Sequence, residues 1–140
     1  ISRGAGILAS QILGADFAYM GTRFISSKES LAKPEYKAML VDSVAKDIIN
    51  TAAFTGIPNN MLRQSIEKAG FDPDNIPSSA KSKLNFDDPH SGAKAWRDIW
   101  SAGHGVGEVK EILSVKEIVA SLTTQYQETL QKPIITRRFI

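Results

Sequence analysis

The chain has 140 residues, 42% hydrophobic and 23% charged, with a formal net charge of +2, which is ordinary for one soluble domain. The small charge and the lack of a basic block argue against a nucleic-acid partner, and the absence of cysteine excludes disulfides, thiolate chemistry and Cys-based zinc sites. No apolar run approaches the roughly 20 residues that cross a bilayer, and no signal peptide is recognised, so we expect no membrane association and a cytoplasmic location.

The first 24 residues predict one helix-to-strand step of an α/β fold. Gly4–Leu13 carries apolar residues near one face at helical spacing, and Gly14 stands where a glycine commonly ends a helix. Phe17–Met20 is a short apolar run without polar alternation. That pattern is typical of a strand buried on both faces, as in a parallel sheet.

The middle of the chain predicts two further helices. A helix is expected over Pro34–Ile49, because proline suits the first turn and apolar residues recur every four positions. After a turn-rich segment, a second helix is expected over Met61–Ala69, capped by Asn59 or Asn60. Gly70 would end it.

The second half contains a long irregular stretch and one clearly marked helix. Phe71–Gly92 is too long for a typical connection and predicts either a functional excursion or a mobile loop. Ala93–Trp100 predicts a short helix, and Ser101–Gly107 a glycine-rich turn. Ser114 and Glu117 form the S-x-x-E capping box of the last helix, which ends before the next proline.

A glycine and a hydroxyl follow the predicted strand. Gly21 allows close approach to the backbone, and the hydroxyl of Thr22 can bond a phosphate oxygen. At the end of a parallel strand these features predict a phosphate-binding cup, with the turn Ser2–Gly4 of the first helix supplying its second half. The alternative is that Gly21 and Thr22 merely turn the chain.

The glycine-rich turn around His104 is a second candidate site, because histidine moves protons near neutral pH and glycines let a ligand approach. Its spacing differs from a dinucleotide fingerprint. A role as a ligand contact and a role in the core both remain open for His104. Trp96 and Trp100 would share a helix face and are interpreted as core residues. His90 fits a solvated loop, and no metal site is predicted.

Three segments in the same order resemble the nitronate monooxygenases, formerly called 2-nitropropane dioxygenases. The first segment resembles the family's helix, followed by Leu-Gly-Ala-Asp, a strand and Met-Gly-Thr-Arg-Phe. The second resembles the family's Phe-Thr-Gly-x-Pro segment, and the third resembles its Ser-Ala-Gly-Gln-Gly-x-Gly segment. In this chain they read ISRGAGILASQILGADFAYMGTRF, AFTGIPNNML and IWSAGHGVGEV. The matches reach from Ile1 to about Ile118, and Phe71–Gly92 and the tail carry none.

The resemblance implies an α/β fold: the C-terminal part of an FMN-binding (β/α)8 TIM barrel, followed by a mainly helical region. Residues 1–33 would be the end of the barrel, with helix 7, strand 8 and the phosphate-binding loop. Residues 34–132 would be the helical region with substrate-side loops, and residues 133–140 a C-terminal tail. The rest of the barrel would lie upstream of Ile1, where the sequence lacks an initiator Met.

Carried over residue by residue, the resemblance places the FMN phosphate on Tyr19, Met20, Gly21 and Thr22. Tyr19 stands where many relatives have Gln. His104 also replaces a common Gln, which makes it a candidate on the substrate side. The family's proposed catalytic base is a histidine upstream of this chain, so the catalytic residues are unknown here.

The implied function is that of an FMN-dependent oxidoreductase that oxidises alkyl nitronates with dioxygen. One alternative is a flavin-dependent enoyl-acyl-carrier-protein reductase on the same scaffold; Lys81 and Lys83 would suit an acidic carrier protein. Another is a non-enzymatic helical interaction module. The expected partner is a small-molecule substrate, either a nitronate or an enoyl thioester, and a homodimer is left open.

Overall fold

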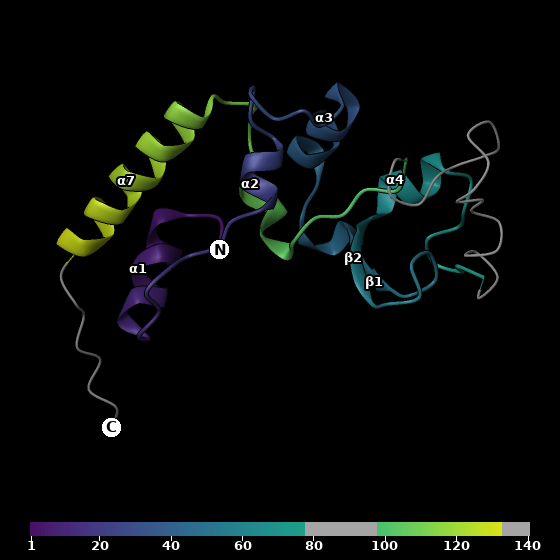
Figure 1. The fold of residues 1–140 in the computed structure, drawn as a ribbon, viewed down its shortest axis with the longest axis horizontal. Coiled ribbons are helices and arrows are strands. Elements are labelled where there is room, and N and C mark those ends of the chain that lie inside the picture. Colours follow the sequence, from purple (N-terminus) through teal and green to yellow (C-terminus); the bar gives the residue numbers. More distant parts are fainter. Residues whose placement is uncertain (78–97, 133–140) are drawn as a thin grey trace.

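The computed structural model describes residues 1–77 and 98–132, which form an α/β structure. In chain order the elements are α1 (Gly4–Ile12), α2 (Thr22–Ile25), α3 (Pro34–Asp42), the 3-10 turn η1 (Ala45–Asp47), β1 (Ile48–Thr51), β2 (Asn59–Leu62), α4 (Arg63–Lys68), the 3-10 helix η2 (His104–Glu108) and α7 (Val115–Gln131). Helices α1 and α7 lie together at one end, and β1, β2 and α4 lie towards the other (Figure 1). Within the described ranges, no helix has the length and apolar character needed to span a membrane.

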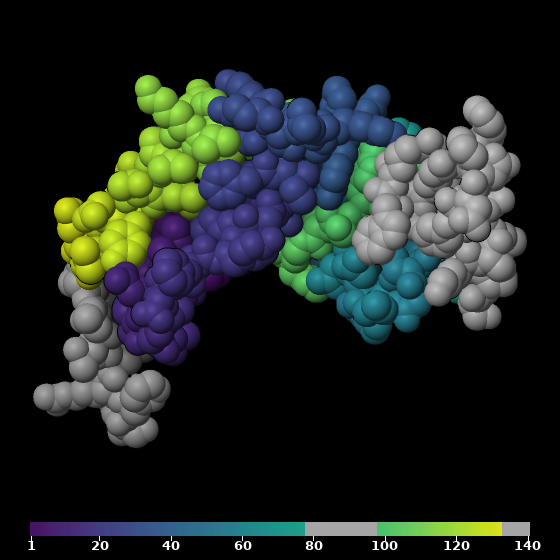
Figure 2. Space-filling model, in the orientation of Figure 1, coloured from purple at the N-terminus to yellow at the C-terminus, as the bar shows by residue number. Residues whose placement is uncertain are grey.

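The described surface forms an arch whose hollow side lies between the α1 end and the hairpin end (Figure 2). Two clusters of buried side chains hold the central and hairpin parts together. One joins α3, the hairpin and η2: Leu40, Ile48, Leu62, Trp100, Ala102, Val106 and Val109. The other lies under the hairpin and α4: Phe54, Met61, Ile66 and Ile99.

Helix α1 confirms the first predicted helix and packs directly on α7. Gly14 follows it with φ +93°, the left-handed conformation expected of a terminal glycine. At Gly4 the two backbones nearly touch: a Cβ there would lie 2.2 Å from the carbonyl oxygen of Leu122 and 2.4 Å from the amide nitrogen of Tyr126. The Gly4 amide also donates to Oε1 of Gln125 at 3.0 Å. This packing therefore requires a residue without a side chain.

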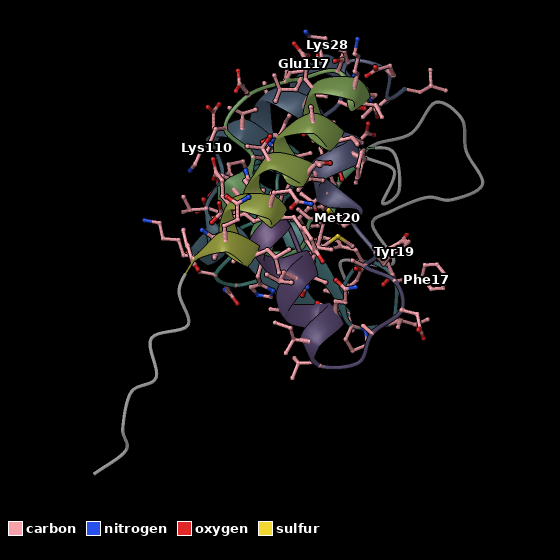
Figure 3. The ribbon with its side chains drawn as sticks, turned by 90° about the vertical axis from the view of Figure 1, so that its left-hand side faces the viewer. Phe17, Tyr19, Met20, Lys28, Lys110 and Glu117 are labelled. Carbon is pink, nitrogen blue, oxygen red and sulfur yellow. The ribbon has the colours of Figure 1, made fainter. Side chains whose placement is uncertain are left out.

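The start of α7 confirms the predicted capping box and shows a second carboxylate beside it. Ser114 N–H donates to Oε2 of Glu117 at 2.7 Å, and Glu117 N–H donates to Oγ of Ser114 at 3.2 Å. The Nζ of Lys28 lies 3.2 Å from the same carboxylate. Figure 3 labels both residues. The carboxylate of Glu29 accepts from the amide of Val115 at 2.9 Å. Two acidic residues thus satisfy the free amides of this helix end.

We predict that the cap at the start of α7 loses its stabilising effect at low pH. Hydrogen bonds from the Ser114 hydroxyl and amide, with the Lys28 ammonium, lower the pKa of Glu117 to about 2. Because the pKa is depressed in the folded state, the stabilisation is complete above the unfolded pKa of about 4.3 and is lost as pH falls towards 2. The Tm difference between the wild type and Glu117→Gln should therefore be largest near neutral pH and shrink below about pH 4.

Glu128→Gln is the matched control for this titration. Glu128 is exposed on the same helix, and its side chain makes no hydrogen bond or ion pair with the described residues. Its substitution should leave the Tm difference from wild type flat with pH. A flat profile for Glu117→Gln as well would contradict the prediction.

The predicted strand Phe17–Met20 does not form a ladder in this structure. A strand exists only where its amides and carbonyls pair with a neighbour, and no strand among the described residues pairs with this segment. Phe17 and Tyr19 are 93% and 92% exposed and point away from the body, whereas Met20 lies closer in (Figure 3). The segment is extended but unpaired.

The helix predicted over Pro34–Ile49 is wrong in its second half. Helix α3 begins at Pro34 as expected but ends at Asp42, and the chain continues through η1 into β1. Ser43 leaves the helical conformation with ψ 152°, and its hydroxyl donates to the carbonyl of Met39 at 2.6 Å. The β-branched residues that follow favour a strand, and pairing with β2 decides between the two conformations.

The helix predicted over Met61–Ala69 is shorter, because Asn59–Leu62 forms strand β2 and α4 begins only at Arg63. Strands β1 and β2 are antiparallel, with Ile48 opposite Leu62 and Thr51 opposite Asn59. Asn59 and Asn60 are therefore strand residues and not helix caps. Gly70 ends α4 with φ +86°, as predicted. The region 34–132, predicted as mainly helical, thus contains a β-hairpin.

The segment around Ser101 pairs with strand β2 of the hairpin through one short antiparallel bridge. Leu62 N–H donates to the carbonyl of Trp100 at 2.8 Å, and Ala102 N–H donates to the carbonyl of Asn60 at 3.3 Å. The glycine-rich turn that follows begins the 3-10 helix η2. Several sequence predictions lie outside the described residues: the helix before Asp98, the loop beyond Pro77, the tail, and Lys81, Lys83, His90 and Trp96.

Candidate functional site

Two motifs that lie 81 positions apart in the chain meet at one hydrogen bond. The amide of Gly103 donates to Oγ1 of Thr22 at 2.9 Å, which joins the start of α2 to the glycine-rich turn. Gly105 in the same turn lies against Ser2, whose Oγ would be 2.0 Å from a Cβ at that position. The structure therefore brings the opening turn, the Gly21–Thr22 turn and the His104 turn together.

Three consecutive amides at this junction are free. The first turn of α2 leaves the N–H groups of Gly21, Thr22 and Arg23 without an acceptor in the part of the chain that the structure describes. The carbonyl of Gly21 accepts a hydrogen bond from the amide of Phe24 at 2.9 Å, and this bond fixes the direction of the turn. Free amides at the start of a helical turn carry partial positive charge and are suited to an anionic oxygen.

A cavity of about 260 Å³ adjoins these amides. Gly21 opens onto it, because a Cβ at Gly21 would meet no protein atom within 4 Å. The lining comes from α2 and its start, from β2 and from the segment before η2: Gly21, Thr22, Ile25, Asn59, Asn60 and 101–103. Tyr19 and Met20, predicted with Gly21 and Thr22, do not line it.

The turn Ser2–Gly4, expected as the second half of the cup, stays a prediction. The amide of Gly4 is already bonded to the side chain of Gln125, so Gly4 does not offer it to a ligand. Gly103 lines the same cavity as Gly21. Its own amide is used to fix the Thr22 hydroxyl, which leaves the hydroxyl proton of Thr22 available for donation.

The charges beside the junction favour an anion. Arg23 is buried in the first turn of α2, and its Nη1 donates to the carbonyl of Glu108 at 3.5 Å. The carboxylate of Glu108 pairs with Arg3 at 3.5 Å. Arg3 therefore pairs with this carboxylate, whereas the guanidinium of Arg23 contacts only the backbone carbonyl of Glu108, so the three side chains together carry one net positive charge.

His104 is the first residue of η2 and is exposed next to Gly103. It is not among the residues that line the cavity, so its role stays a prediction. No group of three or more His, Asp or Glu side chains in the described ranges is arranged to hold a metal ion.

Sequence reasoning missed the contribution of Asn59, Asn60 and Ser101 to the cavity. The sequence predicts one of the two asparagines as a helix cap and Ser101 as part of a glycine-rich turn. The signal was present, because all three lie in the two segments that resemble a known family.

The model of the nitronate monooxygenase family matches residues 1–125. The chain belongs to this family. The family is one of flavin-dependent oxidoreductases. A probable nitronate monooxygenase from Staphylococcus saprophyticus is 32% identical over 107 residues, which cover 72% of this chain and 30% of that protein. A nitronate monooxygenase from Paraburkholderia phytofirmans is 28% identical over 138 residues, 94% of this chain and 37% of that protein.

Solved structures agree with this assignment. FabK from Thermotoga maritima has a TM-score of 0.70 and 31% identity, over 94% of this chain and 43% of that one. A nitroalkane oxidase from Streptomyces ansochromogenes has a TM-score of 0.64 and 26% identity, over 93% of this chain and 38% of that one. This chain thus spans between 30% and 43% of the length of these relatives.

Proposed function

We propose that this chain supplies the phosphate-binding loop of an FMN-dependent oxidoreductase, nitronate monooxygenase-like, that oxidises alkyl nitronates with dioxygen. The observation that carries the proposal is the row of three free amides at Gly21, Thr22 and Arg23, which opens on a cavity. When bound, the flavin would supply the electron chemistry. The residues of this chain would hold its phosphate and shape the space beside it.

The donors present fit a phosphate dianion. Backbone amides and a hydroxyl supply hydrogen bonds that strengthen when the acceptor is charged. Gly21 leaves room for the phosphate to approach the backbone, and Arg23 places a buried positive charge in the same turn. Tyr19 and Met20 would contribute through their backbone, since neither side chain lines the cavity.

We further propose that this chain is the C-terminal part of the (β/α)8 barrel enzyme, with residues 1–33 forming its end. Phe17–Met20 would be the eighth strand, paired by strands from upstream of Ile1. The exposure of Phe17 and Tyr19 supports this, because such apolar rings are ordinarily covered. The share of the relatives' length that this chain spans supports it too.

The first test is the colour of the purified full-length protein. We expect FMN absorbance, and oxygen uptake when an alkyl nitronate is added. Protein that purifies without flavin and does not bind added FMN would overturn the proposal.

The enoyl-acyl-carrier-protein reductase is the second candidate, and the structural similarity to FabK is consistent with it. Reduction of an enoyl thioester by a nicotinamide donor, without nitronate-dependent oxygen uptake, would favour this alternative. Membership of an oxidoreductase family favours either enzyme over a non-enzymatic interaction module.

Thr22→Val should weaken flavin binding. The substitution removes the hydroxyl that would bond the phosphate and leaves the amide of Gly103 without its acceptor. We expect a loss of about 1–2 kcal/mol, so that the Kd for FMN rises roughly 5- to 30-fold. Thr22→Ser keeps the hydroxyl and is the control; equal losses in both variants would contradict a role for the hydrogen bond.

A further inference from the structure

The hairpin brings one more polar side chain to the cavity beside Gly21. Asn60 of strand β2 lines this cavity together with Ile25 and Ala102. Asn60 stands opposite Asn50 on one side and opposite Ala102 on the other. Residues directly opposite each other point to the same face of a sheet. Ala102 belongs to the buried cluster against which Ile25 packs, so the side chain of Asn60 lies on the face of the hairpin that borders the cavity.

A cross-strand hydrogen bond sets the orientation of the Asn60 side-chain amide. Nδ2 of Asn50 donates to Oδ1 of Asn60 at 2.9 Å. This bond uses the oxygen of the Asn60 amide and turns its amino group away from Asn50. Nδ2 of Asn60 meets no acceptor in residues 1–77 and 98–132. A half-buried donor that is already held in place can bind a ligand with little further loss of side-chain freedom.

The other polar groups at the cavity suit a ligand that accepts hydrogen bonds. The carbonyl oxygens of Gly21, Ser101 and Gly103 each accept a hydrogen bond within the protein. The amides of Gly21 and Thr22 and the hydroxyl proton of Thr22 are not used in the described residues. A phosphate dianion offers three strong acceptor oxygens to such donors. The amino group of Asn60 adds a donor from the hairpin to those of the Gly21–Thr22 turn.

We propose that the side-chain amide of Asn60 donates a hydrogen bond to the phosphate of the bound cofactor, and that Asn50 is a positioning residue that keeps this amide in the donating orientation. The inference rests on the proposed function, because it takes the cavity beside Gly21 as the phosphate site. The phosphate is then held from two parts of the chain, the Gly21–Thr22 turn and strand β2. Neither asparagine takes part in the chemistry.

The test is the Kd for FMN, measured by the quenching of flavin fluorescence when FMN is added to the flavin-free full-length protein. Asn60→Ala removes a donor to a charged oxygen, so the Kd should rise about 10- to 100-fold. Asn60→Asp places a carboxylate against the phosphate and should raise the Kd further. Riboflavin lacks the phosphate and should bind the wild type and Asn60→Ala equally. A loss of riboflavin affinity as large as that of FMN would overturn the contact with the phosphate.

Asn50→Asp tests the positioning role. The new carboxylate accepts from Nδ2 of Asn60, so the amide turns over and presents its oxygen to the phosphate. The Kd for FMN should therefore rise about as much as in Asn60→Ala. Asn50→Ala leaves both orientations open, so about half of the molecules are competent and the Kd should about double. Asn50→Asp should add nothing in the Asn60→Ala background, because no amide is left to turn.

Thr51→Asp is the matched control for the added charge. Thr51 is next to Asn50 on strand β1 and points to the other face of the hairpin. Its Oγ1 accepts from the amide of Ala53 at 3.1 Å, a bond that an aspartate side chain can also accept. The Kd for FMN should stay within about twofold of the wild type at about 0.15 M salt. A rise as large as that of Asn50→Asp would overturn the positioning role.

The outcomes distinguish this inference from the proposed function. Wild-type protein that binds no FMN would overturn both. FMN binding with a Kd that is unchanged in Asn60→Ala and Asn50→Asp would overturn only the role of the two asparagines. FMN binding that depends on Asn60, without nitronate-dependent oxygen uptake, would support their role and count against the proposed reaction. If Asn60→Ala does not fold, Asn50→Asp decides alone, because position 50 is exposed.

Discussion

Replacing Gly21 by valine should abolish flavin retention while leaving the fold intact. The backbone of Gly21 has φ −96°, which any residue adopts, and a Cβ there would meet no protein atom within 4 Å. The new side chain would therefore project into the space beside the free amides of α2, where the phosphate is proposed to lie. The measurement is the ratio of flavin to protein after purification, together with the Tm of the flavin-free protein.

The size of the effect should follow the size of the side chain. Gly21→Ala adds one methyl group and should retain part of the flavin, whereas Gly21→Val should retain almost none. The Tm of the two flavin-free variants should agree with that of the flavin-free wild type within the small range of neutral surface substitutions. A Gly21→Val protein that purifies with one flavin per chain would show that the phosphate lies elsewhere.

The largest loss of stability is expected from Gly4→Ala. The added Cβ would lie 2.2 Å from the carbonyl oxygen of Leu122 and 2.4 Å from the amide nitrogen of Tyr126. Both atoms belong to the backbone of α7, so no side-chain rotation relieves the overlap and the helices must separate. We expect a cost of about 3 kcal/mol, at the upper end of overpacking substitutions, measured by urea unfolding of the full-length protein.

Gly6→Ala is the matched control in the same helix. Its Cβ would lie 3.3 Å from Cγ2 of Ile1, the end of a side chain that can move. Because alanine is the better helix former by about 1 kcal/mol, this variant should be as stable as the wild type or slightly more stable. Equal losses in Gly4→Ala and Gly6→Ala would indicate a general intolerance of α1 and would contradict the close contact with α7.

The elements that could be predicted from the sequence are those with strong local signals. The S-x-x-E pair at Ser114 and Glu117 predicts the start of α7, and the structure forms the reciprocal hydrogen bonds. Gly14 and Gly70 predict the ends of α1 and α4, and both have positive φ. Each of these signals acts within one helical turn, so it does not depend on the rest of the fold.

The errors concern segments whose partners are distant in sequence. Apolar residues continue to recur at every fourth position past Asp42, but strand β1 forms because each of its residues pairs with a residue of strand β2. Asn59 and Asn60 have the side chains of helix caps, but their backbone pairs with Asn50 and Thr51. Local propensity is a weak preference that pairing and burial overrule.

The sequence by itself determined the family, the capped helix α7 and the candidacy of Gly21 and Thr22, because these depend on residue types at short spacing. Only the tertiary structure decided that Gly103 fixes the Thr22 hydroxyl, and that Gln125 occupies the amide of Gly4. These contacts join residues 81 and 121 positions apart. Their geometry is set by how the helices and the hairpin pack, and residue spacing along the chain does not contain that information.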